Sequence, residues 1–151
     1  MITIITVGKK HDKGIAHALG DYEKRLKQSF SIKWEIISPS SKTHLQAPQE
    51  ESLRILKRLK DDNYVILLDE RGELIDSPAF SSLIQRPIEH SRSVIIIISG
   101  AYGTTDVVRK RADFVWSLSP LVFPHQLVRL MLVEQLYRAY TIRAGLPYHH
   151  L

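Results

Sequence analysis

The stretch Ser93-Val94-Ile95-Ile96-Ile97-Ile98-Ser99 decides the fold, because four consecutive isoleucines follow a valine there. β-Branched residues favour strands, and a strand that is apolar at every position leaves neither face for water. Strands of this kind lie inside parallel sheets whose two faces are both covered by helices. We therefore predict that Ser93–Ser99 is a central strand of a parallel sheet.

The rest of the chain alternates between strand and helix patterns around this strand. Four more short apolar runs predict strands, at Ile2–Val7, Ile32–Ser38, Asn63–Asp69 and Phe114–Leu118. Apolar residues at helical spacing and helix-start signals predict helices at Asp12–Ser29, Pro48–Lys60, from Ser77 onward, at Thr104–Ala112 and at Pro124–Ala144. Strands that alternate with helices form parallel sheets, so we assign the α/β class: a mostly parallel sheet flanked by helices.

Two local signals refine the middle of the chain. Glu70–Glu73 contains glycine among charged residues and predicts a turn that closes the preceding strand. Ser77 followed by Pro78 predicts a helix with serine as its cap and proline at its first position.

Length and composition limit the class of protein. The 151 residues suit a single domain, 1–151, and show no repeat or linker. The absence of cysteine excludes disulfides, thiolate metal sites and a cysteine nucleophile. No apolar run reaches the roughly 18 to 20 residues of a membrane helix, and the N-terminus does not resemble a signal peptide. We expect a cytoplasmic protein that does not bind a membrane.

The charge is positive and unevenly placed. Lys and Arg number 21 against 16 Asp and Glu, for a net charge of +5. Residues 1–60 carry 12 basic and 6 acidic side chains, residues 61–100 carry 3 and 7, and residues 101–151 carry 6 and 3. Basic ends around an acidic middle favour a polyanionic partner, while ordinary solubility explains the net charge equally well.

The last predicted helix is apolar around most of its circumference. We expect its polar residues Arg129, Glu134, Arg138 and Thr141 to fall near one narrow stripe. A helix of this kind must be buried on more than one side. The sheet can cover one side, and we predict that a second subunit covers the rest, in a homodimer.

Ligands of parallel α/β sheets bind beyond the carboxyl ends of the strands. Three segments follow predicted strands: Leu67–Gly72, Ile98–Gly103 and Leu118–Pro124. Glycines in the second let the backbone approach a ligand, and the third is apolar and suited to an aromatic ring. The chain has no G-x-G-x-x-G motif, no P-loop and no histidine pair with metal-ligand spacing, so we expect no metal site.

Five segments carry a resemblance to a known family: Leu68–Gly72, Ser99–Gly103, Phe123–Arg129, Val133–Tyr140 and Pro147–His149. In this order they closely resemble the RlmH (YbeA) family of SPOUT-class methyltransferases, and the resemblance runs over the whole chain. It implies an α/β sheet with a C-terminal trefoil knot, S-adenosylmethionine as cofactor, and methylation of N3 of a pseudouridine in 23S ribosomal RNA. It also implies a homodimer with its active site close to the subunit interface.

The resemblance assigns the cofactor to the ends of three strands. Carried over position by position, the cofactor-binding residues are Leu68, Gly100, Leu118, Ser119, Pro120, Leu121, Val122 and Phe123. The family usually has Ile-Gly-Gly where this chain has Ser99-Gly100-Ala101, and a residue other than glycine at Ala101 requires an ordinary negative φ. A noncatalytic RNA- or ribosome-binding protein that retains the fold is the alternative to an enzyme, supported by this substitution.

Methyl transfer needs alignment of donor and acceptor and removal of the proton from the acceptor nitrogen. The candidate catalytic residues are His125, Arg138, Tyr148 and His149. Arg138 would hold the base or stabilise its negative charge, and a histidine is the natural base near pH 7. Each also has a structural explanation: His125 would cap or pack the helix start, Arg138 would only pair with Glu134, and Tyr148 would only pin the tail.

Basic side chains near the N-terminus are candidates for phosphate contacts. They are Lys9, Lys10, Lys13, Lys24, Arg25 and Lys27, with Arg129 and the C-terminal tail. There is no appended RNA-binding module, so we expect a target recognised by shape, such as an assembled ribosome.

Overall fold

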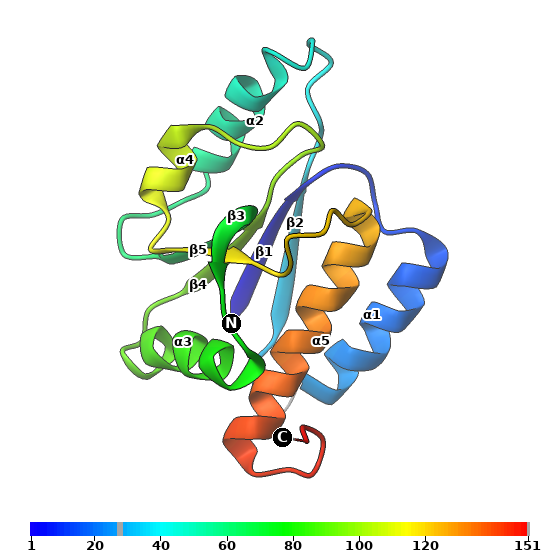
Figure 1. Cartoon of the computed structure of the whole chain (residues 1–151), viewed down its shortest axis with the longest axis vertical. Helices are drawn as coiled ribbons and strands as arrows, with labels where there is room; N and C mark the ends of the chain where they lie inside the picture. The colour runs from blue at the N-terminus through cyan, green and yellow to red at the C-terminus, as the bar shows by residue number, and fades with distance from the viewer. Residues whose placement is uncertain (27–28, 151) are drawn as a thin grey trace.

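The computed structural model describes residues 1–26 and 29–150, and this part of the chain forms five strands that alternate with five helices (Figure 1). In chain order they are β1 (Ile2–Val7), α1 (Lys13–Leu26), β2 (Ile32–Ile37), α2 (Ala47–Leu56), β3 (Tyr64–Leu74), α3 (Ser77–Glu89), β4 (Val94–Ile98), α4 (Asp106–Arg111), β5 (Phe114–Ser117) and α5 (His125–Ala144). The predicted α/β alternation is confirmed.

All five strands join one sheet, in the order β2-β1-β4-β3-β5, and every pair is parallel. β4 occupies the centre, as the isoleucine run predicted, and all five of its residues are buried. Its side chains alternate between the faces: Ile96 and Ile98 enter one core, and Ile95 and Ile97 enter the other.

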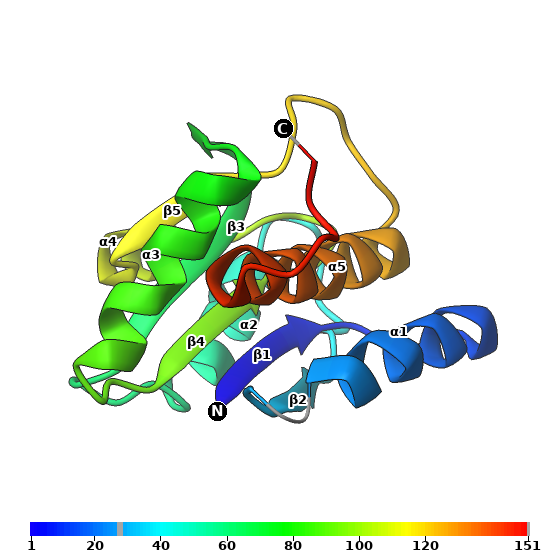
Figure 2. The ribbon, with the colours of Figure 1, turned by 90° about the horizontal axis from the view of Figure 1, so that it is seen from below.

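Helices cover both faces of the sheet. Figures 1 and 2 show α1, α5 and α3 side by side on one face, with α5 in the middle. α2 and α4 cover the other face, where Ile55 and Val108 join the smaller core. The carboxyl ends of the strands therefore open between two helical layers.

The helix α5 differs from its prediction in two ways. Part of its apolar surface packs against α1 and α3 in the same chain, in addition to the sheet. The single polar stripe is also wrong. Arg129 and Arg138 are nine residues apart, about two and a half turns, and so lie on opposite sides of the helix. Arg129 is fully buried, whereas Glu134 and Arg138 are half-buried on the other side.

The predicted turn at Glu70–Glu73 is wrong, because β3 continues to Leu74. Both Leu68 and Glu73 pair with Trp116, so residues 69–72 bulge out of the ladder before pairing resumes. Turn-type residues suit this bulge as well as they suit a turn, and pairing with β5 decides between the two.

Helix boundaries shift by small amounts. Asp76, and not Ser77, caps α3: its carboxylate accepts the backbone N–H of Ala79 at 2.8 Å, with Pro78 in the first turn. The helix expected at Pro48–Lys60 begins at Ala47 and ends at Leu56. Lys27 lies outside the described residues. Among the described helices, none has both the length and the apolar character needed to cross a membrane.

Candidate active site

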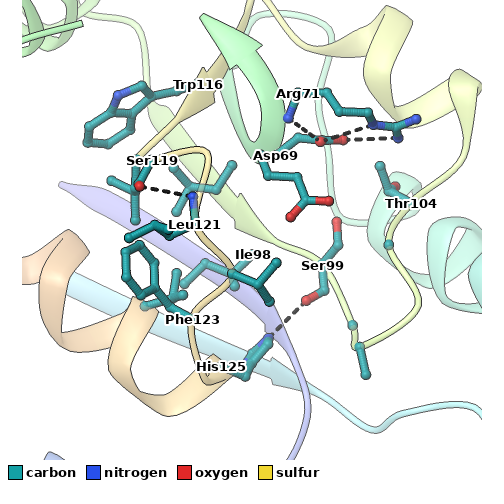
Figure 3. A pocket seen from close by; sticks show the side chains of 18 of the residues that line it. Asp69, Arg71, Ile98, Ser99, Thr104, Trp116, Ser119, Leu121, Phe123 and His125 are labelled. Carbon is teal, nitrogen blue, oxygen red and sulfur yellow. Dashed lines mark hydrogen bonds and ion pairs between the residues drawn. The ribbon is translucent and has the colours of Figure 1, made fainter. Parts of the chain in front are cut away.

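A cavity of about 680 Å³ opens at the carboxyl edge of the sheet, over the ends of β3, β4 and β5 (Figure 3). Its lining residues come from the bulged part of β3, from the ends of β4 and β5 with the segments that follow them, and from the first turn of α5. This is where parallel α/β sheets bind ligands, and the volume suits a molecule of cofactor size.

Most of the predicted cofactor residues line this cavity. They are Leu68, Gly100, Leu118, Ser119, Leu121, Val122 and Phe123. Pro120 is exposed and is not among the residues that line the cavity. The structure thus brings together segments that lie up to 55 positions apart in the sequence, counted from Leu68 to Phe123.

The turn after β4 is closed by its two glycines. Gly103 donates its N–H to the carbonyl of Gly100 at 3.0 Å, and its φ of 84° requires glycine. Ala101 does not have a positive φ, so alanine fits there without strain. The departure from the family pattern at Ala101 leaves the turn intact.

Gly100 is glycine for a reason that the sequence did not indicate. A Cβ at this position would lie 2.5 Å from Oε2 and 3.0 Å from Oε1 of Glu51, a residue of α2. The expected role of Gly100 was close approach to a ligand, but its open side faces this buried carboxylate. Glu51 was not among the sequence candidates.

The loop after β5 is held by serines. Ser117 donates its hydroxyl to the carbonyl of Ser119 at 3.0 Å, and the Ser119 hydroxyl accepts the N–H of Leu121 at 3.0 Å. Trp116 stacks on Phe80 with ring centroids 4.2 Å apart, and its buried indole N–H has no partner among the described residues. The result is an apolar wall with one free donor, which suits an aromatic heterocycle.

Asp69 forms the charged wall of the cavity (Figure 3). Its carboxylate accepts hydrogen bonds from Nη2 of Arg109 at 2.7 Å and from the backbone N–H of Arg71 at 2.9 Å. Burial by itself would raise the pKa of Asp69, but these hydrogen bonds outweigh burial and lower its pKa from 3.8 to about 2. The carboxylate is therefore ionised at pH 7, and the two arginines compensate its charge.

We expect Asp69 to make folding stability depend on acid. Its folded-state pKa lies below the unfolded value, so its contribution is complete above about pH 4 and is lost as the pH falls toward 2. Asp69→Asn should remove about 1 to 2 kcal/mol at pH 7 and flatten the profile between pH 4 and 2, measured by urea unfolding. Asp106→Asn, at a side chain that is 83% exposed, is the control; an equal loss there would contradict the prediction.

His125 ties α5 to the turn after β4. Its Nε2 lies 2.9 Å from the carbonyl oxygen of Ser99, and since a carbonyl only accepts, Nε2 carries the proton (Figure 3). Burial, opposed by this hydrogen bond and aided by the charge of Arg129, lowers the pKa of His125. The ring is thus neutral at pH 7 and its N–H is engaged, which suits a positioning role.

The other three catalytic candidates form a separate cluster around Glu134. Arg138 donates Nε and Nη2 to Oε1 of Glu134 at 3.0 and 2.6 Å, and its Nη1 lies 3.2 Å from Nδ1 of His149. Tyr148 donates its hydroxyl to the same carboxylate oxygen at 3.1 Å, and its ring lies 4.8 Å from the guanidinium. Burial raises the pKa of Tyr148, with the charge of Glu134 adding to the effect, so the phenol stays protonated.

A second cavity, of about 760 Å³, adjoins this cluster. Glu134 and His149 line it, and Trp116 and Leu118 line both cavities. Trp116 and Leu118 therefore form a wall between the cavity at the strand ends and the cavity beside the Arg138 cluster. The structure divides the predicted catalytic residues: His125 borders the first cavity, and His149 borders the second.

The candidate phosphate-contact residues fall into a buried and an exposed group. Arg129 is wrong as a phosphate contact, because it is fully buried. It donates to the carbonyl of Lys9 at 2.9 Å and lies 3.1 Å from Nδ1 of His11, which holds the loop after β1 against α5. Lys9, Lys10, Lys13, Lys24 and Arg25 are exposed. The expected polyanion surface thus remains available on this loop and on α1.

Within residues 1–26 and 29–150, no group of three or more histidine, aspartate or glutamate side chains is placed to hold a metal ion. The fold and the two cavities together define a parallel α/β protein with a ligand site at the carboxyl edge of its sheet.

The chain belongs to the SPOUT methyltransferase family, whose model, described as "Predicted SPOUT methyltransferase", matches residues 1–149. It is 39% identical over 158 aligned positions to the ribosomal RNA large subunit methyltransferase H of Clostridium botulinum, covering 98% of both chains. It is 40% identical to the protein of that name from Desulfitobacterium hafniense, again covering 98% of both chains. Membership in this family implies the C-terminal trefoil knot.

A solved structure shows a similar fold. The crystal structure of a methylase-family protein from Neisseria gonorrhoeae superposes with a TM-score of 0.51 and 14% identity, covering 99% of this chain and 85% of that one. At this identity the likeness concerns the fold alone.

Proposed function

We propose that this protein transfers a methyl group from S-adenosylmethionine to N3 of a pseudouridine in 23S ribosomal RNA. The observation that carries the proposal is the cavity formed at the carboxyl ends of β3, β4 and β5 in a SPOUT chain. The names of the relatives, ribosomal RNA large subunit methyltransferase H, support the RNA substrate.

The residues present fit this cofactor. Leu118, Leu121 and Phe123 offer an apolar surface to the adenine, beside the unpartnered N–H of Trp116. The buried hydroxyl of Ser99 and the buried Oε2 of Glu51 also have no partner among the described residues, and both belong to the region of the glycine turn. The bound cofactor supplies an electrophilic methyl group, so the protein need only align it and manage one proton.

The Arg138 cluster fits the acceptor base. Removal of the N3 proton leaves negative charge on the ring, and a fixed guanidinium stabilises charge that develops there. Glu134 raises the pKa of Arg138 by hydrogen bonding, so this group is always charged. We assign Arg138 the role of stabilising this charge. We assign Tyr148 and His149 the positioning of Arg138, and His125 the positioning of the glycine turn.

We further propose a homodimer. Large apolar side chains stay exposed around the two cavities, namely Leu74, Leu121, Val122 and Leu127. Leu121 and Val122 line the first cavity and Leu127 lines the second, so a subunit seated there would place the active site at the interface. A monomer by light scattering at micromolar concentration would contradict this part of the proposal.

The exposed lysines of the loop after β1 and of α1 would supply phosphate contacts. We propose that a dimer without an appended RNA-binding module recognises the shape of the assembled ribosome in the cytoplasm. Faster methylation of naked RNA fragments than of ribosomes would contradict the preference for the ribosome.

Cofactor binding separates the enzyme from the noncatalytic RNA- or ribosome-binding alternative. We expect calorimetry to show one S-adenosylmethionine site per chain, and we expect Leu118→Asp, which places a charge in the apolar wall, to weaken binding at least tenfold. Lys110→Asp, at an exposed residue of α4, is the control. Absence of binding to the wild-type protein would favour the noncatalytic alternative, whose only support, Ala101, is unstrained.

A further inference from the structure

Glu51 is a buried carboxylate that lacks a cationic partner. The residue is 4% exposed, and its Oε1 accepts the backbone N–H of Ser40 at 3.3 Å. Its Oε2 has no hydrogen-bond partner, and among the described residues no ion pair involves Glu51. The neighbouring Glu50, in contrast, is paired with both Lys42 and Arg54.

The carboxylate lies directly behind the turn that lines the cavity. Oε2 would be 2.5 Å from a Cβ at Gly100, so it occupies the space that a side chain there would fill. Gly100 itself lines the cavity. The backbone of Gly100 therefore lies between the Glu51 carboxylate and a ligand in that cavity.

The next residue of α2 holds this arrangement in place. Ser52 accepts the backbone N–H of Thr105 at 3.3 Å, and its hydroxyl lies 3.4 Å from that of Thr104. Glu51 and Ser52 thus contact the two ends of the turn. These contacts fix α2 relative to the turn, and the Glu51 carboxylate is buried against it.

A buried charge without a partner is unfavourable, and a cation on a ligand nearby would compensate it. The other acidic groups of the cavity are already balanced or solvated. Asp69 is paired with Arg71 and Arg109, and Glu70 is exposed. Glu51 is the acidic group next to the cavity that has no cationic partner among the described residues.

We propose that Glu51 selects the charged methyl donor over its neutral product by acting through the glycine turn. This inference rests on the proposed function. S-Adenosylmethionine carries a sulfonium, an ammonium and a carboxylate, for a net charge of +1. In the transfer the S–CH₃ bond breaks with its electron pair left on sulfur, a bond forms from N3 to the methyl carbon, and the N3 proton goes to solvent. The product S-adenosylhomocysteine has no net charge.

The carboxylate therefore attracts the donor more than the product. Because the site is buried, the attraction is weakly screened. Before transfer Glu51 favours binding, and after transfer that attraction to sulfur is gone, so the product leaves more readily. Glu51 is a specificity residue in this account and touches no reacting atom.

The test is the ratio of two dissociation constants, measured by calorimetry on the dimeric protein. We expect Glu51→Gln to weaken S-adenosylmethionine about tenfold, which corresponds to about 1.4 kcal/mol, and to weaken S-adenosylhomocysteine less than threefold. Glu51→Asp keeps the charge and should keep the wild-type ratio. Glu50→Gln makes the same change of charge at a side chain that is half-exposed and already paired, and it should change neither constant.

Three outcomes would overturn the proposal. Equal weakening of both ligands by Glu51→Gln, or an equal change of ratio in Glu51→Asp, would show that Glu51 only shapes the turn. Unchanged constants in Glu51→Gln would show no role at all. A wild-type protein that binds neither ligand would instead refute the proposed function, so the two failures are distinguishable. Thermal unfolding of each variant checks that the fold is retained.

Discussion

Arg138→Ala is expected to reduce the rate of methyl transfer at least about 100-fold while cofactor affinity stays within twofold. The guanidinium is held by two hydrogen bonds to Glu134 and by the ring of Tyr148, so it is fixed before substrate arrives. Removing a preorganised group that stabilises developing charge lowers rates by about this factor. Arg138 does not line the cofactor cavity, which is why binding should persist.

Single-turnover kinetics at saturating cofactor measures this effect. Arg143→Ala is the matched control, because Arg143 is an exposed arginine in the last turn of the same helix. We expect that control to retain the wild-type rate within twofold. Near-wild-type turnover in Arg138→Ala would show that Arg138 serves only as the partner of Glu134.

Gly72→Ala is expected to destabilise the protein by about 3 kcal/mol, a fall in melting temperature of roughly 10 °C. A Cβ at Gly72 would lie 2.6 Å from the carbonyl oxygen of Val115 and 2.8 Å from the carbonyl carbon of Trp116. These are backbone atoms of β5, so no side-chain rotation relieves the clash. Because the bulge at residues 69–72 carries Asp69 to the cavity, we also expect weaker cofactor binding.

Gly20→Ala is the control for this substitution. Gly20 lies inside α1, and nothing lies within 4 Å of a Cβ placed there. Alanine favours helix over glycine, so this variant should be stabilised by about 0.5 to 1 kcal/mol. Thermal unfolding of both variants decides the matter: a Gly72→Ala protein as stable as wild type would contradict the geometry of the bulge.

The sequence predicts this fold well where one residue type repeats without interruption. Ile95–Ile98 is apolar and β-branched at each position, and so short a run favours a strand covered on both faces. The path of Glu70–Glu73 was predicted wrongly because its charged residues and glycine suit a turn locally. Pairing with β5 is a tertiary contact, and a local pattern does not encode it.

The candidate site follows the same division. The order of strands and helices was enough to find the three candidate segments Leu67–Gly72, Ile98–Gly103 and Leu118–Pro124. The individual cofactor candidates within them came from the family resemblance. Glu51 was missed because it reaches the turn from α2, far away in sequence. A signal was present: Ala47, Glu51 and Ile55 recur at four-residue spacing, which places a glutamate on the buried face of a helix.

The predicted helix by itself separates His125 from Arg138, because 13 residues span about 20 Å, but the cavity that each group borders could not be predicted. Both groups belong to α5 or to the tail that follows it, and spacing along a helix does not show which cavity a side chain borders. The contact of His125 with Ser99 depends on how α5 docks against the end of β4.

The most direct test of the proposed function is transfer of a labelled methyl group to ribosomes that lack the modification, followed by mapping of the labelled base. We predict one methyl group per 23S ribosomal RNA, at N3 of a pseudouridine, introduced by the wild-type protein from S-adenosylmethionine. Absence of label in the RNA, or label at a different kind of nucleotide, would contradict the proposed function.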